Sequence, residues 1–86
     1  MQVIWKYRVG VPDFAWNMPI GTEILTVDTQ NELPVMWALV NPDAPMELRA
    51  FISIPTGKTF DGPLKKYIGT FFVDGLVFHL FEVKME

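Results

Sequence analysis

The sequence contains no cysteine, one histidine and one serine among its 86 residues. Without cysteine, no disulfide, zinc–thiolate site or thiol nucleophile can form. His79 has no second histidine or cysteine with which to share a metal, and Ser53 lies in ISIP rather than in the turn that exposes a nucleophilic serine. The acidic residues lie mostly in predicted turns, with no pair spaced for acid–base work. We therefore expect a protein that is not an enzyme and that holds no metal or cofactor.

Basic residues and long apolar runs are also scarce. Seven lysines and arginines against ten acidic residues give a net charge of −3. Binding to duplex nucleic acid needs a basic patch, and crossing a membrane needs about 20 apolar residues in a row. The N-terminal segment MQVIWKYRV is too short and too charged for a signal peptide. We expect no duplex nucleic-acid partner, no membrane association and, since cysteine is absent, a reducing cytoplasm.

Apolar residues, in contrast, are abundant. They make up 50% of the chain, and 14% of all residues are aromatic. A chain of this length buries only about 60% of its unfolded surface, so a monomer leaves much apolar surface in water. Homo-oligomerisation is the simplest way to cover that surface.

Short apolar segments alternate with turns every 8 to 12 residues, and no helical pattern with caps occurs. This spacing predicts one all-β domain over residues 1–86, with about seven short antiparallel strands in a small sandwich or rolled barrel. The predicted strands are Val3–Val9, Phe14–Met18, Glu23–Thr29, Val35–Val40, Glu47–Ile54, Tyr67–Val73 and Leu76–Lys84.

Alternation predicts which side chains of a strand face the core. In segment 47–54 the aliphatic residues Leu48, Ala50, Ile52 and Ile54 are expected inside, which leaves Arg49, Phe51 and Ser53 outside. In segment 23–29, Leu25 and Val27 are expected on one face, with Ile24, Thr26 and Asp28 on the other.

The last two strands form the clearest element, a β-hairpin with the turn Asp74-Gly75. Asp-Gly between apolar strands favours a type I′ turn, which fixes the register. One face then pairs Val73 with Leu76, Phe71 with Phe78, Gly69 with Leu80 and Tyr67 with Glu82. The other face pairs Phe72 with Val77, Thr70 with His79 and Ile68 with Phe81. Opposite Leu80, Gly69 is expected to let a ring or another backbone approach closely.

Both faces of this hairpin are apolar, whereas a solvated antiparallel sheet alternates apolar and polar residues. A second copy or another molecule must therefore cover one face. The predicted interface residues are Ile68, Phe72, Val77 and Phe81.

The segment 55–66 is the longest irregular stretch, and it contains Gly57-Lys58-Thr59. These residues match the end of a P-loop, but Ile52 occupies the position of its first glycine. A nucleotide-hydrolysing site is therefore rejected. An anion-binding loop around Lys58 and Thr59 and an ordinary surface loop remain as alternatives.

Several other residues have two interpretations. His79 either bonds Thr70 inside an apolar interface or contacts a ligand in a cleft between subunits. Trp16, beside an edge and a turn, is the best candidate for an exposed partner-binding aromatic, and Arg49 is a candidate phosphate clamp. The predicted ligand-binding residues are Arg49, Lys58, Thr59, Trp16, Thr70 and His79.

The segments VIWKY, MPIGTEILTVDTQ, PVMWALVNPDAP, TGK, YIGTF and LVFHLFE resemble a family of small, mostly uncharacterised proteins of tailed bacteriophages. The most specific parts are WALV with its proline-bounded turn and IGTF followed by LVFHLFE. The resemblance implies an accessory protein in the cytoplasm of the infected host bacterium.

By analogy with small phage β proteins, the resemblance implies a homo-oligomeric anti-defence factor. Such a factor would bind and sequester a small nucleotide-like immune signal, as a sponge. An inhibitor that binds a host protein and a minor virion or assembly component are the alternatives.

Overall fold

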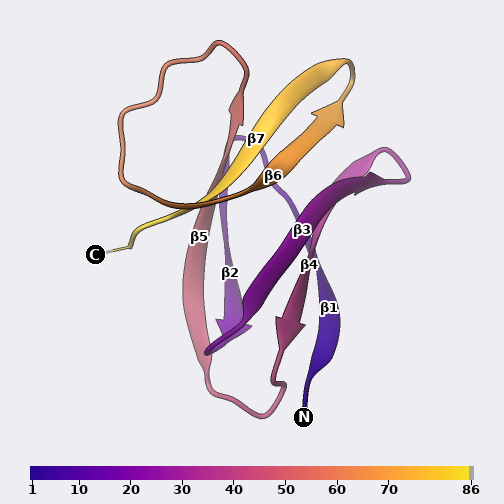
Figure 1. Ribbon diagram of the computed structural model, residues 1–86, viewed down its shortest axis with the longest axis vertical. Helices are drawn as coiled ribbons and strands as arrows, with labels where there is room; N and C mark the ends of the chain where they lie inside the picture. Colours follow the sequence, from indigo (N-terminus) through magenta and orange to yellow (C-terminus); the bar gives the residue numbers. More distant parts are fainter. Residues whose placement is uncertain (86) are drawn as a thin grey trace.

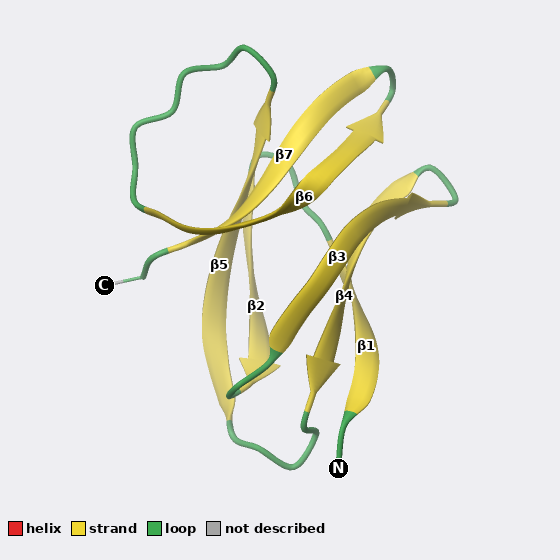
Figure 2. Cartoon of the chain, in the orientation of Figure 1, coloured by secondary structure: helices red, strands yellow, loops and turns green. Residues whose placement is uncertain are grey.

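A computed structural model describes residues 1–85, which form seven antiparallel strands and no helix (Figure 2). The strands are β1 (Val3–Arg8), β2 (Asp13–Pro19), β3 (Glu23–Gln30), β4 (Leu33–Val40), β5 (Met46–Pro55), β6 (Leu64–Val73) and β7 (Leu76–Val83). The predicted all-β class and number of strands are confirmed. Within residues 1–85 there is accordingly no helix of the length and apolarity that spanning a membrane requires.

The strands form two sheets, one of three strands in the order β1-β4-β3 and one of four strands in the order β2-β5-β7-β6. Figure 1 shows the β3–β4 and β6–β7 hairpins side by side, with the segment after β5 arching away from the sheet. The Cα positions span 39 × 33 × 15 Å, the thickness of two packed layers. The described chain is thus a small open sandwich, since its two sheets do not close into a barrel.

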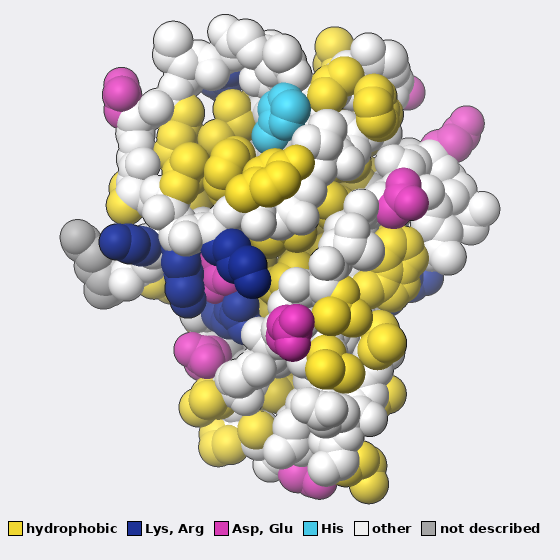
Figure 3. Space-filling model, in the orientation of Figure 1, with side chains coloured by type: hydrophobic (Ala, Val, Ile, Leu, Met, Phe, Trp, Pro, Cys, Tyr) yellow, Lys and Arg dark blue, Asp and Glu magenta, His cyan; other side chains and the backbone are white. Residues whose placement is uncertain are grey.

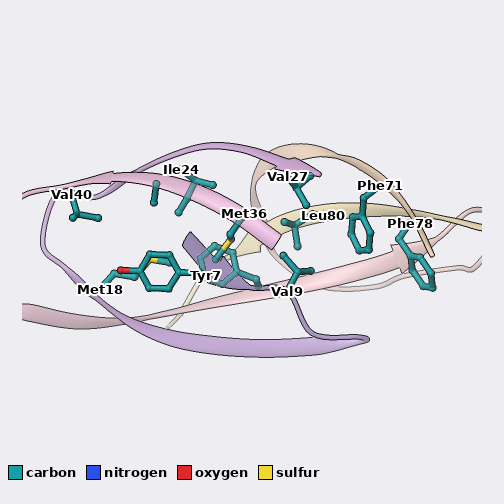
Figure 4. Packing of buried hydrophobic residues seen from close by; sticks show 12 residues of the cluster. Tyr7, Val9, Met18, Ile24, Val27, Met36, Val40, Phe71, Phe78 and Leu80 are labelled. Atoms are coloured by element: carbon teal, nitrogen blue, oxygen red, sulfur yellow. The ribbon is translucent and has the colours of Figure 1, made fainter. Parts of the chain in front are cut away.

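The core lies between the two sheets (Figure 4). β1 contributes Tyr7, and β4 contributes Met36. The four-stranded sheet contributes Phe51, Phe71 and Leu80, each no more than 1% exposed. Every strand therefore presents one apolar face to the interior, as the period of two requires.

The C-terminal hairpin has the predicted register up to Gly69. Asp74 and Gly75 have φ of 50° and 76°, the positive values that a type I′ turn needs. The pairs from Val73↔Leu76 to Gly69↔Leu80 occur as predicted on both faces.

Beyond Gly69 the predicted register is wrong. A register shift between Tyr67 and Gly69 pairs Tyr67 with Phe81, and Lys66 rather than Tyr67 pairs with Glu82. The extra residue of this bulge is Ile68, which packs against the buried core instead of facing Phe81. Ile68 is thereby removed from the predicted interface.

Gly69 does allow a close approach, but the nearest neighbour is the Val27 side chain rather than the predicted ring or backbone. A Cβ built on Gly69 would lie 2.8 Å from Val27 Cγ1, so only glycine lets β6 pass this close to β3. The Thr29 hydroxyl donates a hydrogen bond to the Phe72 carbonyl oxygen at 2.9 Å along the same seam. β3 and β6 therefore hold one edge of the sandwich together.

Two predicted strand faces are wrong. In β5, Phe51 and Ser53 are buried at 1% exposure, while Leu48 is 49% exposed and Ile52 and Ile54 are only half-buried. The interior of β5 is thus the face that carries Phe51 and Ser53.

In β3, a register shift between Ile24 and Thr26 turns both Ile24 and Val27 inward and leaves Leu25 exposed. The bulge breaks the alternation that the sequence pattern predicted, because one extra residue reverses the faces that follow it.

Candidate binding face

The outer side of the four-stranded sheet is the candidate functional surface, called here the four-strand outer face. Its members come from alternate positions of the ladders, opposite the buried side chains. They are Asp13, Ala15 and Asn17 of β2, Leu48, Ala50, Ile52 and Ile54 of β5, Leu64, Tyr67, Thr70 and Phe72 of β6, and Val77, His79, Phe81 and Val83 of β7. Asp13 is the only charged side chain among them. Phe72 and Tyr67 are 62% and 52% exposed, so this face offers aromatic surface to a partner.

The outer face of the three-stranded sheet is different. Its ladders place the charged side chains of Lys6, Arg8, Glu23 and Asp28 around Trp37. Lys6 Nζ donates a hydrogen bond to the Gln30 side chain at 2.8 Å across this sheet. Charged side chains cover this second face, and it has the pattern of a solvated sheet.

A chain of hydrogen bonds crosses the four-strand outer face at His79. The two ring nitrogens contact two threonines, with Nε2 2.7 Å from Thr56 Oγ1 and Nδ1 3.1 Å from Thr70 Oγ1. Thr70 Oγ1 in turn lies 2.6 Å from the Tyr67 hydroxyl. Figure 3 shows the single histidine among hydrophobic side chains. The predicted Thr70–His79 pair is confirmed, whereas its partners Thr56 and Tyr67 were not predicted.

The hydrogen-bond chain fits a neutral imidazole. The Thr56 hydroxyl donates to the Val77 carbonyl oxygen at 3.4 Å, so its oxygen is free to accept from His79 Nε2–H. In the tautomer that carries its proton on Nε2, Nδ1 accepts from the Thr70 hydroxyl, and the Tyr67 hydroxyl can donate to the Thr70 oxygen. Each polar atom of His79 thereby has a partner without any charged group.

The segment between β5 and β6 borders a small pocket beside this chain. The pocket has a volume of about 200 Å³, and its lining includes Lys58, Thr59 and Phe60, Ile52 and Ile54 of β5, and Asp13 of β2. Ile54 is the ladder partner of His79, so the pocket adjoins the hydroxyl–imidazole chain. Lys58 and Thr59 line this pocket, whereas Thr70 and His79 lie beyond Ile54 on the neighbouring strands, so the predicted ligand site remains a prediction.

Arg49 lies elsewhere, on the inner side of β5, and is tied to Glu82. Its guanidinium donates two hydrogen bonds to that carboxylate, at 2.8 and 2.7 Å, and a third to the Thr22 carbonyl oxygen. The side chains of Arg49 and Glu82 are 14% and 5% exposed. Arg49 thus stabilises the fold, and the expectation that it points outward to clamp a phosphate is wrong.

The ion pair shifts both pKa values. Burial alone raises the pKa of Glu82, but the hydrogen bond and charge of Arg49, together with Lys65 and Lys66, outweigh it and hold the pKa below its usual value. The hydrogen bond to Glu82 raises the pKa of Arg49 despite its burial. The pair is therefore charged at neutral pH.

Trp16 also has an internal role. It is 38% exposed, but its Nε1–H donates to the Arg8 carbonyl oxygen at 2.7 Å and its ring meets Tyr7 edge-on. Trp16 links β2 to β1 on the side of the sandwich opposite the β3–β6 seam. It does not join His79, because Trp16 and Arg49 are ladder partners on the inner side of the four-stranded sheet.

Three of the four predicted interface residues lie on the four-strand outer face, namely Phe72, Val77 and Phe81. Phe81 also packs against Tyr67, with ring centroids 5.3 Å apart. The sequence could have indicated Tyr67 only through the bulge at Ile68, which has no local signal. Within residues 1–85, no three His, Asp or Glu side chains are grouped to hold a metal ion.

One family model matches this chain, over residues 1–86, and it is described as a domain of unknown function (DUF7352). No curated protein and no solved structure matches. The match names no source organism, so the bacteriophage origin remains a prediction.

Proposed function

We propose that this chain, which belongs to the DUF7352 family, is a non-enzymatic binding protein that self-associates through its four-strand outer face. The observation that carries the proposal is the composition of that face, where Asp13 is the only charged side chain among the outward-facing ladder positions. Sheets that face water carry polar residues at alternate positions, as the three-stranded sheet does.

A second copy is the partner that the charges favour. The chain carries a net charge of −3, so two copies repel each other wherever their charged surfaces meet. On the four-strand outer face that repulsion is smallest. A two-fold contact would bring this weakly charged surface of one copy against the same surface of the other.

Sedimentation velocity at micromolar concentration tests self-association. Wild-type protein is expected to sediment as more than one chain, and Phe72→Asp to sediment as a monomer because it places a charge in the contact. The matched control is Ile4→Asp, since Ile4 is 57% exposed on the outer face of the three-stranded sheet. A monomeric wild type, or an assembly that only Ile4→Asp disrupts, would contradict the proposal.

The second candidate function is the capture of a small nucleotide-like ligand, which the pocket beside His79 favours. Lys58 offers a cation for a phosphate, and Ile52, Ile54 and Phe60 offer apolar surface for a base. The bacteriophage resemblance supplies a context for this candidate, a sponge for immune signals in the host cytoplasm. A host protein bound to the same face is the alternative partner.

A thermal-shift assay with cyclic and linear adenine and guanine nucleotides tests ligand capture. A ligand at a hundredfold excess over its Kd raises the free energy of unfolding by about 2.7 kcal/mol. The shift should be lost in Lys58→Ala, and the matched control Lys6→Ala on the other sheet should retain it. No shift with any of these nucleotides would remove this candidate and leave self-association untouched.

A further inference from the structure

We infer that self-association of this protein is pH-dependent, with His79 as the switch: copies associate while its imidazole is neutral and separate when it takes up a proton. The inference rests on the self-association proposed above, because His79 lies on the four-strand outer face. In a single chain His79 is only partly buried, so water can still solvate its charge. Contact with a second copy would remove that water.

The neighbours of His79 cannot neutralise a charge. Its ring nitrogens contact the hydroxyls of Thr56 and Thr70, and Thr70 contacts the Tyr67 hydroxyl. Its ladder partner on β5 is Ile54. A protonated imidazole covered by a second copy would thus be a buried charge without a counter-ion, which is strongly unfavourable.

The charged groups of the surrounding elements do not reverse the expected direction, in which protonation of His79 disfavours association. Asp13 lies on β2, across β5 from His79, and it lines the neighbouring pocket together with the cation Lys58. Lys58 on the adjoining segment is itself positive. On β7, Glu82 points to the inner side and pairs with Arg49.

Protonation would also disturb the hydrogen-bond chain. In the neutral tautomer that carries its proton on Nε2, Nδ1 accepts from the Thr70 hydroxyl. Once Nδ1 also carries a proton, it must donate to Thr70, whose hydroxyl then has to turn toward Tyr67. Protonation therefore reorients the hydroxyls of Thr70 and Tyr67 and supplies no counter-ion.

The expected effect is large enough to measure. Imidazoles ordinarily take up a proton around pH 6.5, and each copy released from the assembly would bind one proton. Between about pH 7.5 and about pH 5.5, the dissociation constant should rise at least about tenfold. The effect has the sign opposite to that of an interface that pairs histidine with a carboxylate.

Sedimentation velocity of wild type and His79→Gln at the two ends of that pH range is the test. Glutamine keeps a donor and an acceptor but cannot take up a proton, so its dissociation constant should change less than about twofold. Circular dichroism at both pH values would show that each protein stays folded. Calorimetric dilution of wild type in two buffers of different ionisation enthalpy counts the protons taken up and needs no variant.

The outcomes separate the two proposals. An assembly that is indifferent to pH, or a shift that His79→Gln retains, would overturn the role of His79 and leave self-association standing. No proton uptake on dissociation of wild type would do the same. A single-chain species at both pH values would overturn both proposals together.

Discussion

The two faces of the β5–β7 ladder have exchanged the residues that each is expected to carry. The inner face holds a charged pair, Arg49 and Glu82, in a nearly dry environment. The outer face, which has no second sheet over it, carries Ile52, Ile54 and Phe81. The inner charges have their partners within the chain, whereas the outer apolar side chains are only half-buried, with Phe81 packed against Tyr67. The apolar surface that the chain leaves uncovered therefore lies on this outer side.

The largest expected effect comes from breaking the ion pair on the inner face of the four-stranded sheet. Arg49→Met leaves Glu82 buried without its cation, and we expect it to lower the free energy of unfolding by about 3–5 kcal/mol. Urea unfolding at a fixed protein concentration measures this loss. The double variant Arg49→Met/Glu82→Leu removes both charges and should recover most of it. A single variant as stable as wild type would show that the pair is not buried in solution.

A smaller loss of stability is expected at Gly69, which faces the interior, and a still smaller one at Thr70, the next residue, which faces outward. Gly69→Ala places a methyl group against Val27 on the inner side and should destabilise the protein by about 1–3 kcal/mol. Thr70→Ala, one residue on, alters only the exposed outer face and should change stability by less than about 0.5 kcal/mol. Thermal unfolding of both variants, at a concentration low enough to keep them monomeric, measures the difference. Equal losses would contradict the close contact between β3 and β6.

The predicted parts of the fold are those that local signals determine. Asp74-Gly75 fixed the hairpin register as far as Gly69, since the turn geometry propagates along the ladder. It could not reveal the bulge at Ile68, because the extra residue is absorbed by packing against the core. The number of short strands and the all-β class were likewise predicted from a local pattern, short apolar segments separated by turns.

The inverted face of β5 has a non-local cause. Aliphatic residues at alternate positions suggested that Ile52 and Ile54 face inward, but Arg49 has its partner Glu82 33 residues away. Ser53 is likewise buried because its hydroxyl donates to the Gly10 carbonyl oxygen at 2.9 Å. No pattern within β5 contains these partners, so the alternation was correct and its direction was not.

The candidate site was partly predictable for the same reason. Thr70 and His79 face each other across the hairpin, which the register determines. Thr56 reaches His79 because the chain turns back over the sheet after β5, and Tyr67 reaches Thr70 because of the bulge at Ile68. Neither contact had a local signal in the sequence. Arg49 and Trp16 were grouped with His79 by residue type alone, and their inward direction separates them from it.

The free edge of β6 has a consequence for the kind of aggregate that this protein can form. Its two register shifts, near Lys65 and Ile68, interrupt the row of backbone donors and acceptors that an incoming strand needs, and Thr29 already occupies the Phe72 carbonyl. Copies therefore cannot easily pair strands at this edge to extend the sheet into a fibre. Such an edge favours assemblies of limited size over open-ended sheet extension.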